Sequence, residues 1–204
     1  MFKNRKAARR KVIMVPLALM TLLSTAGLAF AADIPETGSA LNRVIQLAYS
    51  VDTFYFLMSG ALVMWMAAGF AMLEAGLVRS KNTVEILTKN VALYSIACIT
   101  YLLVGYNIMY GDGVSSLIPG LSWLLGPEHS VDAVLASGGK TNHSVLSDFF
   151  FQVVFVATAM SIVSGAVAER MKLWAFLTFA VVLTAFIYPV EGYWKWGGGF
   201  LDKL

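Results

Sequence analysis

Residues 54–73 determine the fold class, because they read FYFLMSGALVMWMAAGFAML without one charged side chain. An α-helix of roughly 20 apolar residues crosses a hydrocarbon core about 30 Å thick, and this run has that length. A helix also satisfies its backbone N–H and C=O groups within the segment, as a lipid environment requires. We therefore predict a transmembrane helix here, extended to about residues 54–77.

Three further runs have the same character. Of the 204 residues, 58% are hydrophobic and only 13% are charged, which is outside the usual range of soluble domains. The net charge of +3 is not gathered along one solvated face, so we expect no nucleic-acid partner. The chain is thus predicted to be an all-α membrane protein in a lipid bilayer. Its other helices are expected at about residues 86–110, 148–168 and 173–190.

The start of the chain has the order of a secretory signal peptide. Lys and Arg cluster in residues 3–11, an apolar run covers residues 12–28, and AFA at 29–31 has the small-x-small form of a cleavage site. An uncleaved first helix is the alternative, but the polar stretch at 33–39 favours cleavage. The predicted divisions are a signal peptide at 1–31, an exported segment at 32–51 and a membrane domain at 52–204.

Charges in the connections predict the topology. Lys and Arg gather around residues 79–89 and 170–172, and the positive-inside rule places both connections in the cytoplasm. The long connection at residues 111–147 contains one Lys and three acids, so it is expected outside. Within it, residues 117–125 are apolar enough to lie on the membrane surface or to pack against the bundle, and we expect a short interfacial helix. We expect a multi-pass protein of the inner (plasma) membrane whose mature N-terminus lies outside.

Few side chains indicate chemistry. Glu74 and Glu169 lie at the ends of the first and third predicted helices, each close in sequence to an arginine. We interpret them as structural end-pairs, with proton carriers as the alternative. His129 and His143 both fall in the long connection, where we expect them to be solvated. Because no metal-binding pair, phosphate loop or paired nucleophile is recognisable, we predict no metal, no cofactor and no enzyme activity.

The third predicted helix has two distinct faces. Ala157, Ser161 and Gly165 recur every fourth residue and form a small-residue stripe that permits close helix packing. Phe151 and Phe155 lie on roughly the opposite side. If the stripe packs into the bundle, the two rings face lipid or a second surface such as a pore. Composition alone favours lipid or core packing, because aromatic rings commonly fill such faces.

Several local strings share their order and spacing with a known family. AMLEAGLVRSKN at 71–82, FQVVF at 151–155, GAVAER at 165–170 and WGGGFL at 196–201 resemble the ammonium transporters of the Amt/MEP/Rh superfamily, and its Amt branch in particular. The resemblance runs from about residue 52 to the C-terminus, apart from the long connection. It implies the first four helices of an eleven-helix fold, in which two inverted halves enclose a pore. The 196–201 string resembles the segment that leads into the family's fifth helix.

The resemblance also implies a site at the outer mouth of the conduction path. Phe155 matches one of two stacked gating rings, and Phe151 matches the aromatic residue one turn above it. Trp196 matches the indole of the outer recruitment site, where cation–π attraction of about 0.5–2 kcal/mol holds ammonium. Trp196, Phe151 and Phe155 are therefore the predicted substrate-binding residues, and Phe155 is the predicted gate.

The function that the resemblance implies is transport of ammonium or ammonia. The complete family protein is a homotrimer with one pore in each subunit, and a PII-type protein is a candidate regulator. The family's pore histidines follow the segment at which this chain stops, so we expect a fragment that transports nothing alone. An ammonium-sensing membrane domain of a signalling protein and an inactive truncated fragment are the alternatives. The sequence beyond residue 204 distinguishes them.

Overall fold

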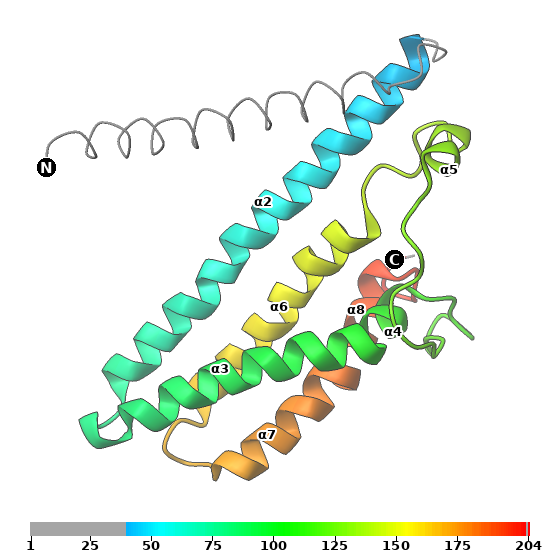
Figure 1. Cartoon of the computed structure of the whole chain (residues 1–204). Coiled ribbons are helices and arrows are strands. Elements are labelled where there is room, and N and C mark those ends of the chain that lie inside the picture. The colour runs from blue at the N-terminus through cyan, green and yellow to red at the C-terminus, as the bar shows by residue number, and fades with distance from the viewer. Residues whose placement is uncertain (1–39, 203) are drawn as a thin grey trace, which may run out of the picture. The chain divides into compact units, whose positions relative to one another are not determined.

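The computed structural model describes residues 40–202 and 204, and this part of the chain contains helices and loops but no strand. Four helical spans in it are long and apolar enough to cross a membrane (Figure 1). The all-α prediction is therefore confirmed for the described residues, whereas the signal peptide predicted at 1–31 lies outside them. The four spans are Ala40–Leu77, Ser80–Tyr110, Val145–Ala166 and Leu173–Trp196.

The first span is a single helix, α2 (Ala40–Leu77), which begins well before the predicted start at residue 54. Its 38 residues measure about 57 Å at 1.5 Å per residue, nearly twice the thickness of a hydrocarbon core. Residues 40–51, predicted as part of an exported segment, are therefore a helical extension of the span. Hydropathy missed this extension because it contains polar side chains between apolar residues three or four positions apart.

The second and fourth spans each contain a π-helical turn, and the two turns contact each other. The hydroxyl oxygens of Thr100 and Thr184 lie 2.7 Å apart at this contact. Gly105 permits the close approach, since a Cβ there would lie 3.1 Å from Pro189 Cγ. The second span comprises α3 (Thr83–Thr100), η2 (Tyr101–Gly105) and α4 (Tyr106–Tyr110); the fourth comprises α7 (Leu173–Val182), η3 (Leu183–Ile187) and α8 (Tyr188–Trp196).

Pro189 accounts for the π-helical turn in the fourth span. Proline lacks an N–H, and its ring clashes with the carbonyl four residues earlier, which here belongs to Ala185 within η3. The wider turn relieves this clash, and the helix continues to Trp196 instead of ending near the predicted residue 190. Trp196 is thus the last helical residue of the fourth span.

The third span is α6 (Val145–Ala166), and it forms the core together with α3 and α7. Met160 of α6 is fully buried between α3 and α7, and Val154 is fully buried against the second span. Ala157 and Ser161 of the predicted small-residue stripe are also buried, but Gly165 is exposed. The stripe is therefore buried over its first two positions, and at the third an added Cβ would lie 3.7 Å from Cγ of Glu74 in α2.

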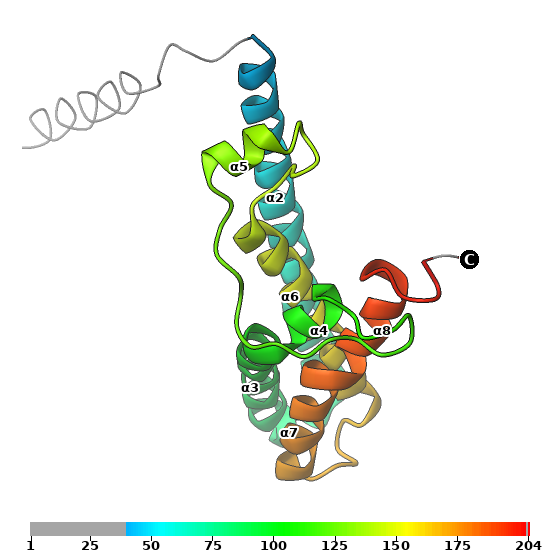
Figure 2. The same ribbon diagram turned by 90° about the vertical axis from the view of Figure 1, so that its right-hand side faces the viewer.

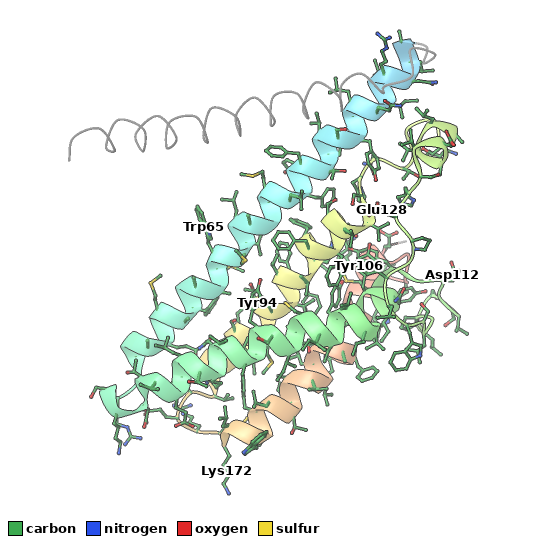
Figure 3. All side chains as sticks on the ribbon, viewed as in Figure 1. Trp65, Tyr94, Tyr106, Asp112, Glu128 and Lys172 are labelled. Carbon is green, nitrogen blue, oxygen red and sulfur yellow. The ribbon has the colours of Figure 1, made fainter. Side chains whose placement is uncertain are left out.

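Helix α2 contacts the other helices at few points. Gly60 and Glu74 are its only buried residues. A Cβ at Gly60 would lie 2.8 Å from the Phe150 ring, so the glycine lets α2 approach α6. Trp65, by contrast, is 69% exposed and points away from the other helices in Figure 3. Most of the apolar surface of α2 is thus left uncovered by the described residues.

The long connection contains a short helix, α5 (Val131–Ala136), which lies beside α2 (Figure 2). The interfacial helix predicted at 117–125 is wrong, because those residues are irregular. They are held instead by side chains from α8, since the Trp194 indole N–H donates to the Leu117 carbonyl at 2.9 Å. Glu128 fixes the end of the connection by accepting hydrogen bonds from the first residues of α6.

Glu74 and Glu169 lie at the end of the spans away from the long connection, and their partners differ from the arginines nearest to them in sequence. Glu169 pairs with Arg79 at 3.2 Å, which joins the two short turns. Glu74, only 2% exposed, pairs instead with Lys89 at 3.5 Å. Its Oε2 also accepts a hydrogen bond from the Ser164 hydroxyl at 2.8 Å. Both acids therefore form ion pairs as expected, but Glu74 joins three spans rather than one turn.

Candidate functional site

The three predicted site residues line one cavity of about 710 Å³, which we call the aromatic cavity. It lies at the end of the helices that carries the long connection, where Tyr106 is labelled in Figure 3. Its volume falls within the range of small-molecule sites in proteins. The walls come from α2, α4, α6, α8 and the loop before α6. Seven rings line it, namely Phe56, Tyr106, Tyr110, Phe151, Phe155, Tyr188 and Trp196, together with His143, Asp148 and Gln152.

Phe151 and Phe155 are one helical turn apart on α6 and therefore face the same side. Their ring centroids lie 5.0 Å apart in an edge-to-face arrangement. Phe56 of α2 extends this cluster, with its ring centroid 5.2 Å from that of Phe151. Both α6 rings are half-buried and border the cavity, rather than facing only lipid or the core as composition favoured.

Trp196 reaches the cavity because α8 continues past Pro189. Its side chain is the exposed member of the lining, at 62%, whereas the other lining residues are buried or half-buried. Helices α4 and α8 lie side by side here (Figure 1), so Trp196 and the tyrosines of α4 border the same space. An indole placed in this way is accessible to a cation that arrives from solvent.

Asp148 is the acidic residue of the cavity, and the sequence analysis did not single it out. It is 7% exposed and lies in the first turn of α6. Its Oδ2 accepts a hydrogen bond from the Tyr106 hydroxyl at 2.8 Å, and its Oδ1 accepts one from the Gln152 amide at 3.3 Å. A signal was available, because Asp148, Phe151, Gln152 and Phe155 have the i, i+3, i+4, i+7 spacing of one helix face.

His143 was predicted to be solvated, and that prediction is wrong. The ring is half-buried and packs on Phe56 with centroids 4.5 Å apart. Its Nδ1 lies 2.8 Å from Asn142 Oδ1. His129 is exposed, in agreement with the prediction. His143 thus lines one side of the aromatic cavity. Residues 40–202 contain no cluster of three His, Cys, Asp or Glu residues suited to a metal ion.

Comparison with known proteins gives a consistent family. Residues 54–204 match the sequence model of the Ammonium Transporter Family. The chain is 38% identical over 173 residues to the putative ammonium transporter sll1017 of Synechocystis sp., a match covering 84% of this chain and 37% of the relative. It is 37% identical over 187 residues to the ammonium transporter Amt2 of Archaeoglobus fulgidus, covering 92% and 36%.

A solved structure has a similar arrangement of helices. It is described as a Sensor Amt Protein, with a TM-score of 0.65 and 28% identity over 78% of this chain and 39% of that one. The chain spans little more than a third of the length of the curated relatives above. Its four apolar spans and these relatives make it a multi-pass membrane protein. The family match covers most of the sequence, and the chain therefore belongs to the ammonium transporter family.

Proposed function

We propose that the complete protein transports ammonium or ammonia across a membrane, and that this chain supplies the aromatic entrance of the path. The observation that carries the proposal is the aromatic cavity, which gathers Trp196, Phe151 and Phe155 beside a buried carboxylate. The Synechocystis and Archaeoglobus relatives are named as ammonium transporters, which supports the same substrate.

In this proposal Trp196 recruits the cation. The face of an indole carries negative electrostatic potential and attracts a cation by about 0.5–2 kcal/mol, depending on desolvation. Phe151 and Phe155 follow along α6, with Phe155 about 6 Å further from the long connection by helical rise. An apolar ring at that depth disfavours a hydrated ion, because its lost hydration is not replaced. Phe155 therefore acts as the gate beneath the recruitment site.

The aromatic cavity faces the outside in this proposal. Arg79 and Lys172 lie at the opposite end of the spans, and Lys172 projects from the helices there (Figure 3). By the positive-inside rule that end lies in the cytoplasm, and the membrane in this proposal is the inner (plasma) membrane. The uncovered apolar surface of α2 is available to lipid, to the remainder of the fold and to neighbouring subunits of a trimer. A PII-type regulator would act at the cytoplasmic end.

Sensing is the second candidate function, because the solved structure with a similar fold is described as a sensor. A sensor needs the cation-binding cavity but not a path through the membrane. Reading the gene beyond codon 204 separates the two: further apolar spans support a transporter, and an added soluble signalling domain supports a sensor. For the 204-residue chain alone, which spans little more than a third of the length of these relatives, we expect no uptake; robust, saturable uptake would contradict that expectation.

Uptake of methylammonium tests the transport proposal. The protein to use is the family-length protein, meaning this chain continued by its own gene or, if the gene stops, by the corresponding part of the Archaeoglobus relative. In a strain without ammonium transporters, Trp196→Ala should raise KM, and Phe155→Ala should change the rate of uptake. Trp174→Ala is the matched control, since Trp174 is 80% exposed on α7 and lies outside the cavity lining. Uptake that neither cavity variant alters would refute the assignment.

A further inference from the structure

Asp148 is a buried acid without a cationic partner in the described part of the chain. No Lys or Arg nitrogen there lies within 4.0 Å of its carboxylate. Its two hydrogen bonds come from the neutral side chains of Tyr106 and Gln152. A buried charge is unfavourable unless it is paired, so this carboxylate requires compensation from another source.

The position of Asp148 on α6 supplies only part of that compensation. An acid in the first turn of a helix interacts favourably with the N-terminal end of the dipole, which is equivalent to about half an elementary charge. A carboxylate offers roughly four acceptor positions, and the two hydrogen bonds leave others unused. Asp148 is itself one of the residues that line the aromatic cavity, so a ligand there is within reach of its carboxylate.

The rest of the lining favours one chemical class of ligand. Ring faces have negative potential and add attraction for a cation without supplying one. A hard divalent cation prefers six or more oxygen ligands, whereas most of this lining is aromatic carbon. A monovalent ammonium-class cation suits both features, because it donates N–H groups to a carboxylate and lies against rings.

We propose that Asp148 is the cation-binding carboxylate of the aromatic cavity. An ammonium-class cation donates a hydrogen bond to Asp148 and lies against the neighbouring rings, while Tyr106 and Gln152 hold the carboxylate in place. This inference rests on the proposed function and deepens it, since the cavity then recognises the cation by a fixed charge as well as by Trp196. Recognition through N–H groups also selects ammonium over fully methylated ammonium ions of the same charge.

Methylammonium uptake by the family-length protein tests the inference. Asp148→Asn keeps the side-chain shape and the ability to hydrogen-bond with Tyr106 and Gln152 but removes the charge. Loss of a hydrogen bond to a charged group should raise KM at least about tenfold, with Vmax little changed. Asp148→Glu should lie closer to wild type. Asp132→Asn removes one acid from exposed α5 and should leave KM unchanged.

Competition between cations separates binding from a structural role. In wild type, ammonium should inhibit methylammonium uptake much better than tetramethylammonium does, and in Asp148→Asn this ratio should fall. A variant with lower Vmax, lower thermal stability and an unchanged ratio would show that Asp148 only supports the fold. An unchanged KM in Asp148→Asn, with a raised KM in Trp196→Ala, would overturn this inference alone. If neither variant changes KM, the proposed function fails with it.

Discussion

Replacing Lys89 by Met should destabilise the protein strongly, because it isolates a buried acid. Lys89 Nζ lies 3.5 Å from Glu74 Oε2 and donates to the Ser164 carbonyl at 3.1 Å. Glu74 retains hydrogen bonds from Asn90 and Ser164 in the variant, but no cation. Removing one partner of a buried ion pair typically costs about 3–5 kcal/mol. The Lys89 ammonium also lies 4.9 Å from the centre of the Phe176 ring, and this contact is lost as well.

The double variant provides the internal comparison. Glu74→Gln removes the acid's charge and keeps its shape, so Glu74→Gln with Lys89→Met should be more stable than Lys89→Met alone. A coupling energy of about 0.5–3 kcal/mol is expected between residues in one network. The assay is thermal unfolding of the family-length protein in lipid nanodiscs, monitored by circular dichroism. Additive single effects, or a loss below about 1 kcal/mol for Lys89→Met, would refute a buried ion pair joining these helices.

Two other predictions concern the long connection and the π-helical turns. Partial desolvation raises the pKa of Glu128, but hydrogen bonds from the N–H groups at the start of α6 outweigh it and hold that pKa below its usual value. Stabilisation by Glu128 is therefore present above the unfolded pKa of about 4.3 and is lost as pH falls through the lower folded pKa. Over that pH range, hydrogen exchange of the long connection should become faster in wild type but not in Glu128→Gln. Gly105→Ala should cost about 1–3 kcal/mol by overpacking, first against the buried Tyr101 ring and then against Pro189, measured as thermal stability. Gly76→Ala is its control, with nothing within 4 Å of the added Cβ, and an equal loss in both would contradict the packing argument.

Hydropathy located all four spans but not all of their ends, and the errors have physical causes. The measure responds to transfer into lipid, so it does not detect a helix that continues through a less apolar stretch of sequence, as α2 does over residues 40–51. The fourth span was expected to end near residue 190, where the apolar run ends, whereas the helix continues to Trp196. The π-helical turn before Pro189 relieves the clash of the proline ring and lets the helix continue, and hydropathy carries no information on such a turn.

Ion-pair partners were less predictable than the spans. Sequence proximity favoured Arg79 for Glu74, but these residues are separated by the end of α2 and the start of a turn. The return of α3 alongside α6 places Lys89 near Glu74 instead, and leaves Arg79 for Glu169. Such pairings depend on how three helices cross, which is a property of packing rather than of spacing.

The candidate site shows how a local pattern and a resemblance contribute different information. The resemblance supplied roles for Phe151 and Phe155 but was silent on Asp148, because no role was matched to that position. Helical spacing alone places Asp148 on the same face as both rings, and the structure brings that face to the aromatic cavity. Burying an acid beside two aromatic rings costs free energy, so it is unfavourable on a helix face that serves packing alone. In an apolar membrane span, a single charged residue therefore marks the helix face that requires a polar or cationic partner.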